Sequence, residues 1–489
     1  MQNSNNLYGK KFLEQIAHRV MQEHGFLPDF SPAALDEMAH IQKIDTGVTT
    51  DVKDLRQLPW ISIDNDDSKD LDQLTVAEPL ADNNVKIRVA IADVATLVKK
   101  NSAIDLHANN NTTSVYTAGK TFPMLPENLC NNLTSLNFQE DRKAIIIEMI
   151  VNGNGDIQNP DIYPAQVRNH AKLAYNSVAV WLEGKADKPP AVDPSIAENI
   201  RIQDNVAQKL RTKRHLRGAL ELQTLESRPV FADGEITDLR VEETNRAKQI
   251  IEDFMIAAND ITAGFLKAKQ IPSLRRVVRT PKRWNRIVEI AAQHNYQIPS
   301  EPDSKALADF LTKQRAADPL RFPDLSLIII KLLGAGEYVV ELPGETGPGH
   351  FALAVEDYTH STAPNRRFPD LITQRILLAI LNGTPVPYDQ SELTALARHC
   401  TLKEDDANKV ERQVAKSAAA MLLSNRIGSH FDAICTGAAD KATWVRIFQP
   451  PIEGRLIHGY DGVDVGHRLK VKLIHVDINL GFIDFERVH

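Results

Sequence analysis

The chain has 489 residues and a formal net charge of −7, with 43% hydrophobic and 25% charged residues, which is ordinary for a soluble globular protein. This length allows two to four domains with a sizeable core, and no apolar run approaches the roughly 20 residues that a membrane span needs. The negative charge argues against a protein that coats nucleic acid by bulk electrostatics, although it is compatible with a nucleic-acid enzyme that has one basic channel.

The first 55 residues predict a short helical segment. Phe12, Ile16 and Val20 recur at four-residue spacing, and Ser31-Pro32 is typical of a helix start. These helices are either a small helical or winged-helix module or packing decoration. The N-terminus lacks the basic and apolar regions of a signal peptide, and three widely spaced cysteines indicate neither disulfides nor a zinc site. We therefore expect a cytoplasmic protein that is not bound to a membrane.

An acidic loop follows. The apolar run at 60–63 ends in five aspartates within nine residues, and a second strand-like run spans 74–77. The five acids are Asp64, Asp66, Asp67, Asp70 and Asp72. Such close carboxylates repel one another unless a hard divalent cation lies among them.

A solvated turn would give a similar pattern. A calcium loop of the EF-hand type is excluded, because counting from Asp64 the sixth residue is Lys69 instead of glycine and the twelfth is Thr75 instead of glutamate. The position of the acids at the end of an apolar strand favours a catalytic metal site.

The middle of the chain predicts mixed strands and helices. Strands are expected at 85–94 and 144–151, with a hairpin turn at 153–155. Helices are expected at 105–111, 170–185, 195–222, 243–269 and over most of 280–335. The helix at 195–222 ends in a basic cluster that is either a solvated face or an RNA contact: Arg211, Lys213, Arg214, His215 and Arg217.

The last third predicts a strand at 349–355, a loop at 358–370 and a helix from Asp370 to Gly383. Thr401-Leu-Lys-Glu404 resembles a capping box that opens a helix running to Gly428. Short strands then follow at 444–448, 452–457, 469–476 and 482–485, a spacing typical of a small OB-type barrel.

Six motifs in order resemble the ribonuclease II family, whose RNB domain characterises hydrolytic exoribonucleases. The similarity covers roughly residues 55–425, and residues 430–489 are similar to the family's C-terminal OB-fold domain. The motifs are Ile63–Asp72, Ser114-Val-Tyr116 with Phe122–Pro126, Lys172–Tyr175, Arg217–Leu220, Ile251–Asn259 and His360–Asp370. The resemblance implies an α+β fold: a helical segment at 1–55, a mixed α/β RNB catalytic domain at 56–428 and an OB-fold RNA-binding domain at 429–489.

The resemblance also implies a function, namely 3′-to-5′ degradation of single-stranded RNA to 5′-monophosphates with Mg²⁺, or Mn²⁺ in its place. A monomer is expected. By position, Asp64, Asp70 and Asp72 match the family's metal-site aspartates, and Arg366 matches the arginine that grips the scissile phosphate. The matched RNA-binding residues are Tyr116, which stacks on the terminal base, Tyr175 and Glu252, which favour RNA over DNA, and Glu411, which contacts ribose.

Several positions depart from the family. Gln73 stands where the family has another aspartate, so it would bind a metal through a neutral oxygen and more weakly. Leu222 replaces an aromatic residue that clamps the 3′ bases, and Ala363 and Asn365 replace a serine and an isoleucine. The residues before the domain are too few for paired cold-shock barrels. The alternative prediction is therefore an RNB-fold RNA-binding protein that is catalytically impaired.

Overall fold

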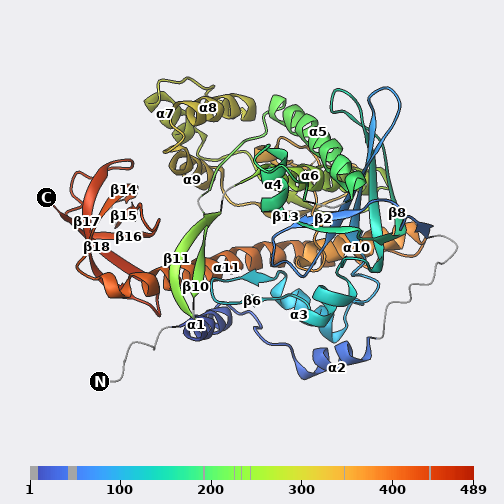
Figure 1. Cartoon of the computed structure of the whole chain (residues 1–489), viewed down its shortest axis with the longest axis horizontal. Coiled ribbons are helices and arrows are strands. Elements are labelled where there is room, and N and C mark those ends of the chain that lie inside the picture. Colours follow the sequence, from blue (N-terminus) through green and yellow to red (C-terminus); the bar gives the residue numbers. More distant parts are fainter. Residues whose placement is uncertain are drawn as a thin grey trace.

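The computed structural model describes residues 9–41, 52–190, 193–224, 226–232, 234–242, 244–345, 347–439 and 442–488. It contains a large sheet with flanking helices, a lobe of three helices, and a barrel at the far end of the long helix α11 (Figure 1). The mixed α/β fold with a C-terminal barrel is confirmed.

A seven-stranded sheet forms the centre, in the order β1-β8-β7-β4-β3-β2-β9. The interior pairs are antiparallel, and the edge strands β1 and β9 pair in parallel. The strands are β1 (Lys53–Asp54), β2 (Ile61–Asp64), β3 (Gln73–Pro79), β4 (Val85–Ala92), β7 (Asp141–Val151), β8 (Ile157–Arg168) and β9 (Ala171–Ala174). The strands and the hairpin turn expected around 60–77, 85–94 and 144–155 are confirmed.

Two long helices, α5 (Pro194–Leu216) and α6 (Arg246–Ala268), pack on this sheet. The Asn199 side chain bonds both the N–H and the carbonyl of Ala77, which holds α5 against β3. α5 ends before the predicted 222, because Gly218 adopts a φ of +101° that helical residues do not. The predicted start of the next helix, Glu243, lies outside the described residues. The remaining helices near the sheet are α3 (Ala103–Asn111), α4 (Tyr175–Leu182) and α10 (Phe368–Leu381), with a π-helical turn at Leu129–Leu133.

Three local predictions were wrong. The helix expected at 170–185 divides into β9 and α4, and the strand expected at 349–355 is a 3₁₀ turn, Phe351–Leu353, followed by a left-handed Ala354. The capping box at 401 does not start a helix. α11 (Gln390–Leu423) begins eleven residues earlier, where the side chain of Asp389 accepts a hydrogen bond from the Glu392 N–H.

The N-terminal helices α1 (Lys10–Glu23) and α2 (Pro32–His40) are packed parts of the body. Leu13, Ile16 and Val20 of α1 share one apolar cluster with α11 and the barrel. The helical lobe is α7 (Trp284–Gln293), α8 (Ser304–Ala317) and α9 (Phe322–Leu333). Three two-stranded antiparallel sheets complete this part: β5 (Val115–Tyr116) with β6 (Thr121–Phe122), β10 (Glu226–Ala232) with β11 (Glu235–Glu242), and β12 (Ser273–Val277) with β13 (Glu337–Glu341).

The C-terminal strands close into a barrel in the order β14-β15-β16-β18-β17. They are β14 (His430–Ala439), β15 (Ala442–Ile447), β16 (Glu453–His458), β17 (Arg468–Asp477) and β18 (Phe482–Val488), preceded by a 3₁₀ turn at Ser424–Arg426. Within the described part of the chain, no helix is both long and apolar enough to cross a membrane.

Candidate active site

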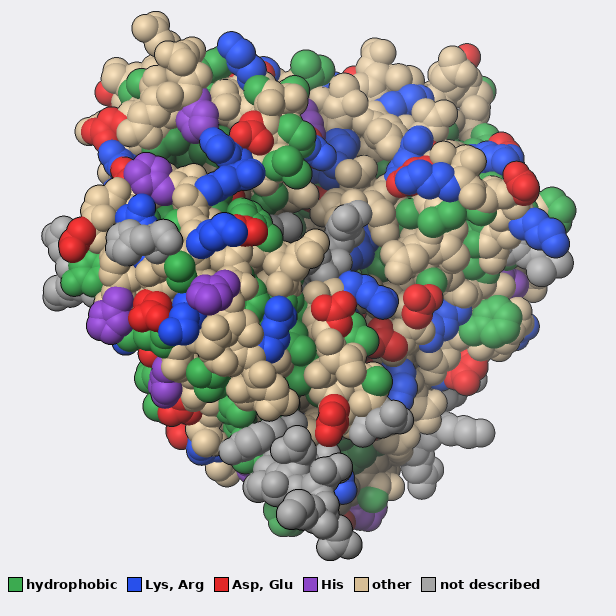
Figure 2. Space-filling model, turned by 60° about the vertical axis from the view of Figure 1, so that its left-hand side comes forward, with side chains coloured by type: hydrophobic (Ala, Val, Ile, Leu, Met, Phe, Trp, Pro, Cys, Tyr) green, Lys and Arg blue, Asp and Glu red, His purple; other side chains and the backbone are tan. Residues whose placement is uncertain are grey.

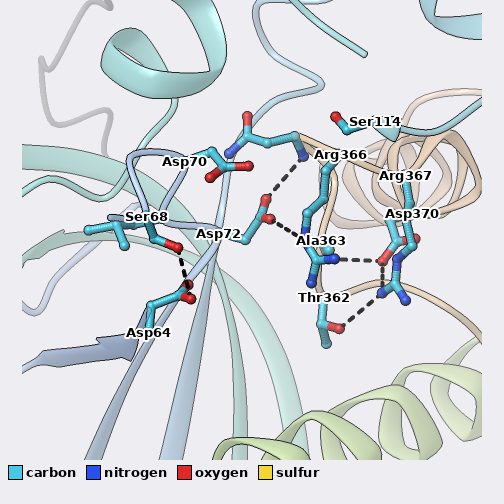
Figure 3. Close-up of polar contacts among 12 residues, drawn as sticks. Asp64, Ser68, Asp70, Asp72, Ser114, Thr362, Ala363, Arg366, Arg367 and Asp370 are labelled. Atoms are coloured by element: carbon cyan, nitrogen blue, oxygen red, sulfur yellow. Dashed lines mark hydrogen bonds and ion pairs between the residues drawn. The ribbon is translucent and has the colours of Figure 1, made fainter. Parts of the chain in front are cut away.

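The acidic loop joins β2 to β3, two neighbouring strands on the side of the sheet that ends in β9. Asp64 is the last residue of β2, and its carboxylate accepts hydrogen bonds from the Asn65 N–H (2.7 Å) and the Ser68 hydroxyl (2.9 Å). Lys172 on β9 donates to the Ser68 carbonyl and so also holds the loop. The loop therefore presents its acids from a rigid sheet edge, as Figure 3 shows for Asp64, Asp70 and Asp72.

Asp72 and Arg366 meet across this edge, although 294 positions separate them in the chain. Asp72 is 2% exposed, and its two oxygens accept from the Asn365 N–H (3.0 Å) and from Arg366 Nε (3.2 Å). Burial raises the pKa of Asp72 to about 7, against the lowering effect of Arg366, and the charge of Asp70 raises it further. One arginine therefore does not neutralise the negative charge of the site.

The β5–β6 hairpin brings Tyr116 to the same place. Its hydroxyl donates to Asp70 at 3.4 Å, and its N–H donates to the Glu411 carboxylate on α11 at 2.8 Å. Burial raises the pKa of Asp70, and the charge of Asp64 adds to that effect. Tyr116 is still 45% exposed, so part of its ring faces solvent. Tyr116, Asp70 and Glu411 thus form a chain of contacts from the hairpin to the acids.

The other expected RNA-binding residues lie in different surroundings. Tyr175, the first residue of α4, has its pKa raised by burial and by the charge of Asp64, which places it near the acids. Glu252 on α6 pairs with Arg211 at 3.0 Å, and Leu222 packs on the α7–α9 lobe. Within the described part of the chain, no hydrogen bond or ion pair joins Glu252 or Leu222 to the acidic loop, so their RNA roles stay predictions.

Sequence reasoning missed the network behind Arg366. Asp370 is fully buried, and its carboxylate accepts from the Ala363 N–H (2.8 Å) and from Arg367 (2.7 Å). Asn259 on α6 accepts from both the N–H and the hydroxyl of Ser361. These bonds shape the turn that presents Arg366, and Figure 3 shows those of Asp370 with Ala363 and Arg367. The motif at 360–370 contains four of these five residues, and the motif at 251–259 ends at the fifth, Asn259, but only the fold shows that they bond to one another.

A divalent metal is the group that this acid set implies. Across the described ranges, no three His, Cys, Asp or Glu side chains already converge as a metal cage. Mg²⁺ does not require one, because it is commonly held by one or two carboxylates and takes its other ligands from phosphate and water. Asp64, Asp70 and Asp72 are hard oxygen donors with unbalanced charge, so they fit such an ion. Gln73 is buried and pairs with Ile91 of β4 in the sheet, and its ligand role stays a prediction.

The fold and this site define a class of protein in which a mixed α/β domain carries a cluster of aspartates beside an arginine and is followed by a closed five-stranded barrel. Residues 52–383 match the RNB domain, and residues 429–488 match the RNase II-type exonuclease C-terminal S1 domain. The chain belongs to the RNB-domain family of RNase II-type proteins. The match to the RNB domain ends at 383, so the boundary predicted at 428 stays a prediction.

Relatives and solved structures agree with this. Ribonuclease R of Escherichia coli (strain K12) is 30% identical over 421 residues, which cover 83% of this chain and 51% of that protein. Mycoplasma genitalium RNase R, solved with ribose-methylated single-stranded RNA, superposes with a TM-score of 0.87 at 22% identity, covering 97% of this chain and 78% of that one. Yeast Ssd1, described as a pseudonuclease, has a TM-score of 0.70 at 15% identity, covering 91% and 55%. The chain spans about half the length of the curated relatives that it matches.

Proposed function

We propose that this protein is a metal-dependent exoribonuclease that removes nucleotides from the 3′ end of single-stranded RNA. The observation that carries the proposal is the joining of Asp72 to Arg366 beside Asp64 and Asp70. Family membership and the names of the relatives support the same reaction. The predicted monomeric state and cytoplasmic location stay predictions.

Arg366 has a geometry suited to phosphate. It uses Nε on Asp72 and donates to no other described side chain, and its own side chain is 43% exposed. Its terminal N–H groups can therefore bond two oxygens of one phosphate, as a planar guanidinium does well. A bound divalent ion would supply an activated water and stabilise the leaving oxygen. Asp64, Asp70 and Asp72 would hold that ion.

The hairpin and its neighbours would recognise the nucleotide. Tyr116 offers an exposed ring on which any base can stack, which makes binding tolerant of sequence. Glu411, held by the Tyr116 N–H, and Tyr175, near Asp64, would contact the sugar of that nucleotide. Glu252 would contact ribose while its carboxylate stays paired with Arg211. A 2′-hydroxyl donates and accepts, so such groups would favour RNA over DNA.

The surface charge adds little to this argument. Figure 2 shows the face that includes the barrel side, with a hollow near its middle. Acidic and basic side chains are intermixed over this face, and neither charge forms a continuous patch across it. This agrees with the net charge of −7. Binding would then depend on local groups and not on a uniformly positive face.

A second candidate is an RNB-fold protein that binds RNA without cleaving it. Gln73 favours it, because a neutral amide stands where the family has an acid. The fold similarity to a protein described as a pseudonuclease shows that the same architecture is compatible with lost chemistry.

A single assay separates the two candidates. Single-stranded RNA with a 5′ label is incubated with the protein in Mg²⁺, in Mn²⁺ or in EDTA, and the products are resolved by length. The exonuclease predicts progressive shortening from the 3′ end and release of 5′-monophosphates with metal only. Tight RNA binding without shortening at any metal concentration would instead establish the binding protein.

A further inference from the structure

The helix α1 has two distinct faces. Its apolar residues are buried against α11 and the barrel, whereas its polar residues recur on the opposite side at the spacing of one helix face. This polar face lines an open groove of about 560 Å³, and Lys120 of the β5–β6 turn also lines it. The α1 residues along the groove are Lys11, Glu14, Gln15, His18, Arg19 and Gln22.

The groove is fixed to the hairpin that carries Tyr116. A Cβ on Gly119 would lie 3.0 Å from the Leu13 carbonyl, so the turn of the hairpin touches the α1 backbone directly. The Phe122 ring lies 6.4 Å from the ring of His18, and the Lys120 ammonium lies 5.1 Å from the centre of the Phe122 ring. Lys120 is therefore held over the groove by the same hairpin that reaches Asp70.

Another lining residue of the groove, Arg19, reaches the barrel. Arg19 donates a hydrogen bond of 2.8 Å to the Asn479 carbonyl in the turn between β17 and β18. The polar face of α1 thus runs from a loop of the S1-type barrel to the hairpin at the candidate active site. Figure 1 shows α1 next to α11 on the side of the molecule away from α8.

The charge of this groove differs from that of the whole protein. Neither Lys11 nor Lys120 has an acidic partner among the residues that the structure describes, and Arg19 pairs only with the exposed Glu23 at 3.4 Å. Glu14 is the acid in the lining, and His18 bonds Asp29. Two lysines, one arginine and two glutamine amides offer donors at intervals along one path, which suits a chain of phosphates.

We propose that the α1 groove binds the ribose-phosphate backbone of the RNA strand between the barrel and the Tyr116 hairpin. That the ligand is RNA rests on the proposed function. RNA fits better than an acidic protein segment, because one wall of the groove belongs to the hairpin that enters the candidate active site.

The test is a charge reversal, Lys11→Glu with Lys120→Glu, against the matched control Lys313→Glu. Lys313 is an exposed lysine of α8 that lies over the Tyr296 ring, far from α1. Binding is measured in EDTA with RNA of about 25 and about 4 nucleotides over a range of salt. For the longer RNA we expect roughly tenfold weaker binding at low salt and a slope of log K against log salt that is shallower by about 1.4, or about 0.7 for each lost phosphate contact. The affinity for the shorter RNA should fall less, and the Lys313→Glu variant should bind both RNAs as the natural protein does.

Two results would overturn the proposal. One is unchanged affinity and salt slope for the longer RNA. The other is an equal loss for both lengths in a folded double variant, because this would show that the substitutions disturb the hairpin and not a backbone groove. Because binding is measured without metal, this test does not depend on cleavage. If the natural protein does not cleave RNA, the proposed function is wrong, but the binding test of the groove remains valid.

Discussion

Asp72 is a buried carboxylate whose charge is only partly compensated. It is 2% exposed, its pKa is raised to about 7 by burial, and Arg366 bonds one of its oxygens. A group in this state gains most when a second positive charge arrives, because desolvation has already been completed during folding. The residue is thus prepared for a cation that the free protein does not provide.

Replacing Asp72 by asparagine should abolish hydrolysis and leave RNA affinity within a few-fold. Asparagine keeps an oxygen for the Asn365 N–H but removes the charge that a metal needs. Cleavage is followed with labelled RNA, and affinity by titration in EDTA. Near-natural turnover in this variant would mean that the acidic loop is not the catalytic centre.

Gln73 gives a second prediction for single residues. A unit charge at about 4 Å is worth roughly 4 kcal/mol at an effective dielectric near 20, before desolvation is subtracted. Gln73→Asp should therefore lower the metal concentration for half-maximal cleavage, and Gln73→Ala should raise it. If the natural protein and both variants titrate alike, the amide points to the opposite face of β3 from Asp72, as adjacent strand residues do.

At the scale of elements, α5 and α6 are joined by buried charges. Asp253 on α6 is 2% exposed and pairs with Arg214 and, at 3.4 Å, with Arg211 of α5. Lys213 pairs with Asp156. The basic cluster that sequence reasoning divided between a solvated face and an RNA contact is therefore largely used inside the protein.

Asp253→Ala should cost about 3–5 kcal/mol of unfolding free energy, because it leaves Arg214 partly buried without its partner and removes one of the acidic partners of Arg211. The control is Glu289→Ala on α7, which removes an exposed pair with Arg286 and should change stability by no more than about 0.5 kcal/mol. Both values come from denaturant titration. Equal, small losses would show that water reaches the α5–α6 contact.

Elements with a strong local pattern could be predicted from the sequence. The strand β4 follows from its apolar alternation, and the strand β7 follows from its nearly unbroken apolar run and from the turn at 153–155. The start of α11 could not, since Thr401–Glu404 is an equally good local helix start. What decides is the burial of Leu393 and Ala397 in the core, which depends on distant residues. Likewise, the positions of the site aspartates follow from motif resemblance, but the bond between Glu411 and the Tyr116 N–H exists only in three dimensions.

At the scale of the whole molecule, the barrel packs directly against the rest of the protein. Arg446 of β15 pairs with Asp324 of α9 at 2.8 Å, and both side chains are 15% exposed. The turn after β17 touches α11 so closely that a Cβ on Gly481 would lie 2.7 Å from the Lys416 Cβ. Deleting the barrel would expose the apolar cluster that it shares with α1 and α11, so point substitutions test its role better.

Arg446 and Lys470 should separate docking from RNA binding. Arg446→Ala should lower stability by about 2–3 kcal/mol, because it leaves Asp324 partly buried and unpaired, and adding Asp324→Asn should recover part of the loss. Lys470→Ala should leave stability nearly unchanged, since its side chain is 73% exposed, and should make the salt dependence of RNA binding shallower. Thermal unfolding and RNA titration give the two readings. A stability loss at Lys470 alone would reverse the assignment.

The helix α11 has 34 residues, and two of its contacts lie close together. Glu411 holds the Tyr116 hairpin, and the Lys416–Ser417 backbone receives the barrel turn five residues later, which is about 7.5 Å along the axis. RNA that contacts the Tyr116 hairpin and RNA that contacts the barrel therefore act on the same short segment of α11. Thermodynamic reciprocity then requires that any factor by which RNA on the barrel tightens the acidic site equals the factor by which a nucleotide in that site tightens the barrel. The two ends of the substrate would communicate through a turn and a half of helix.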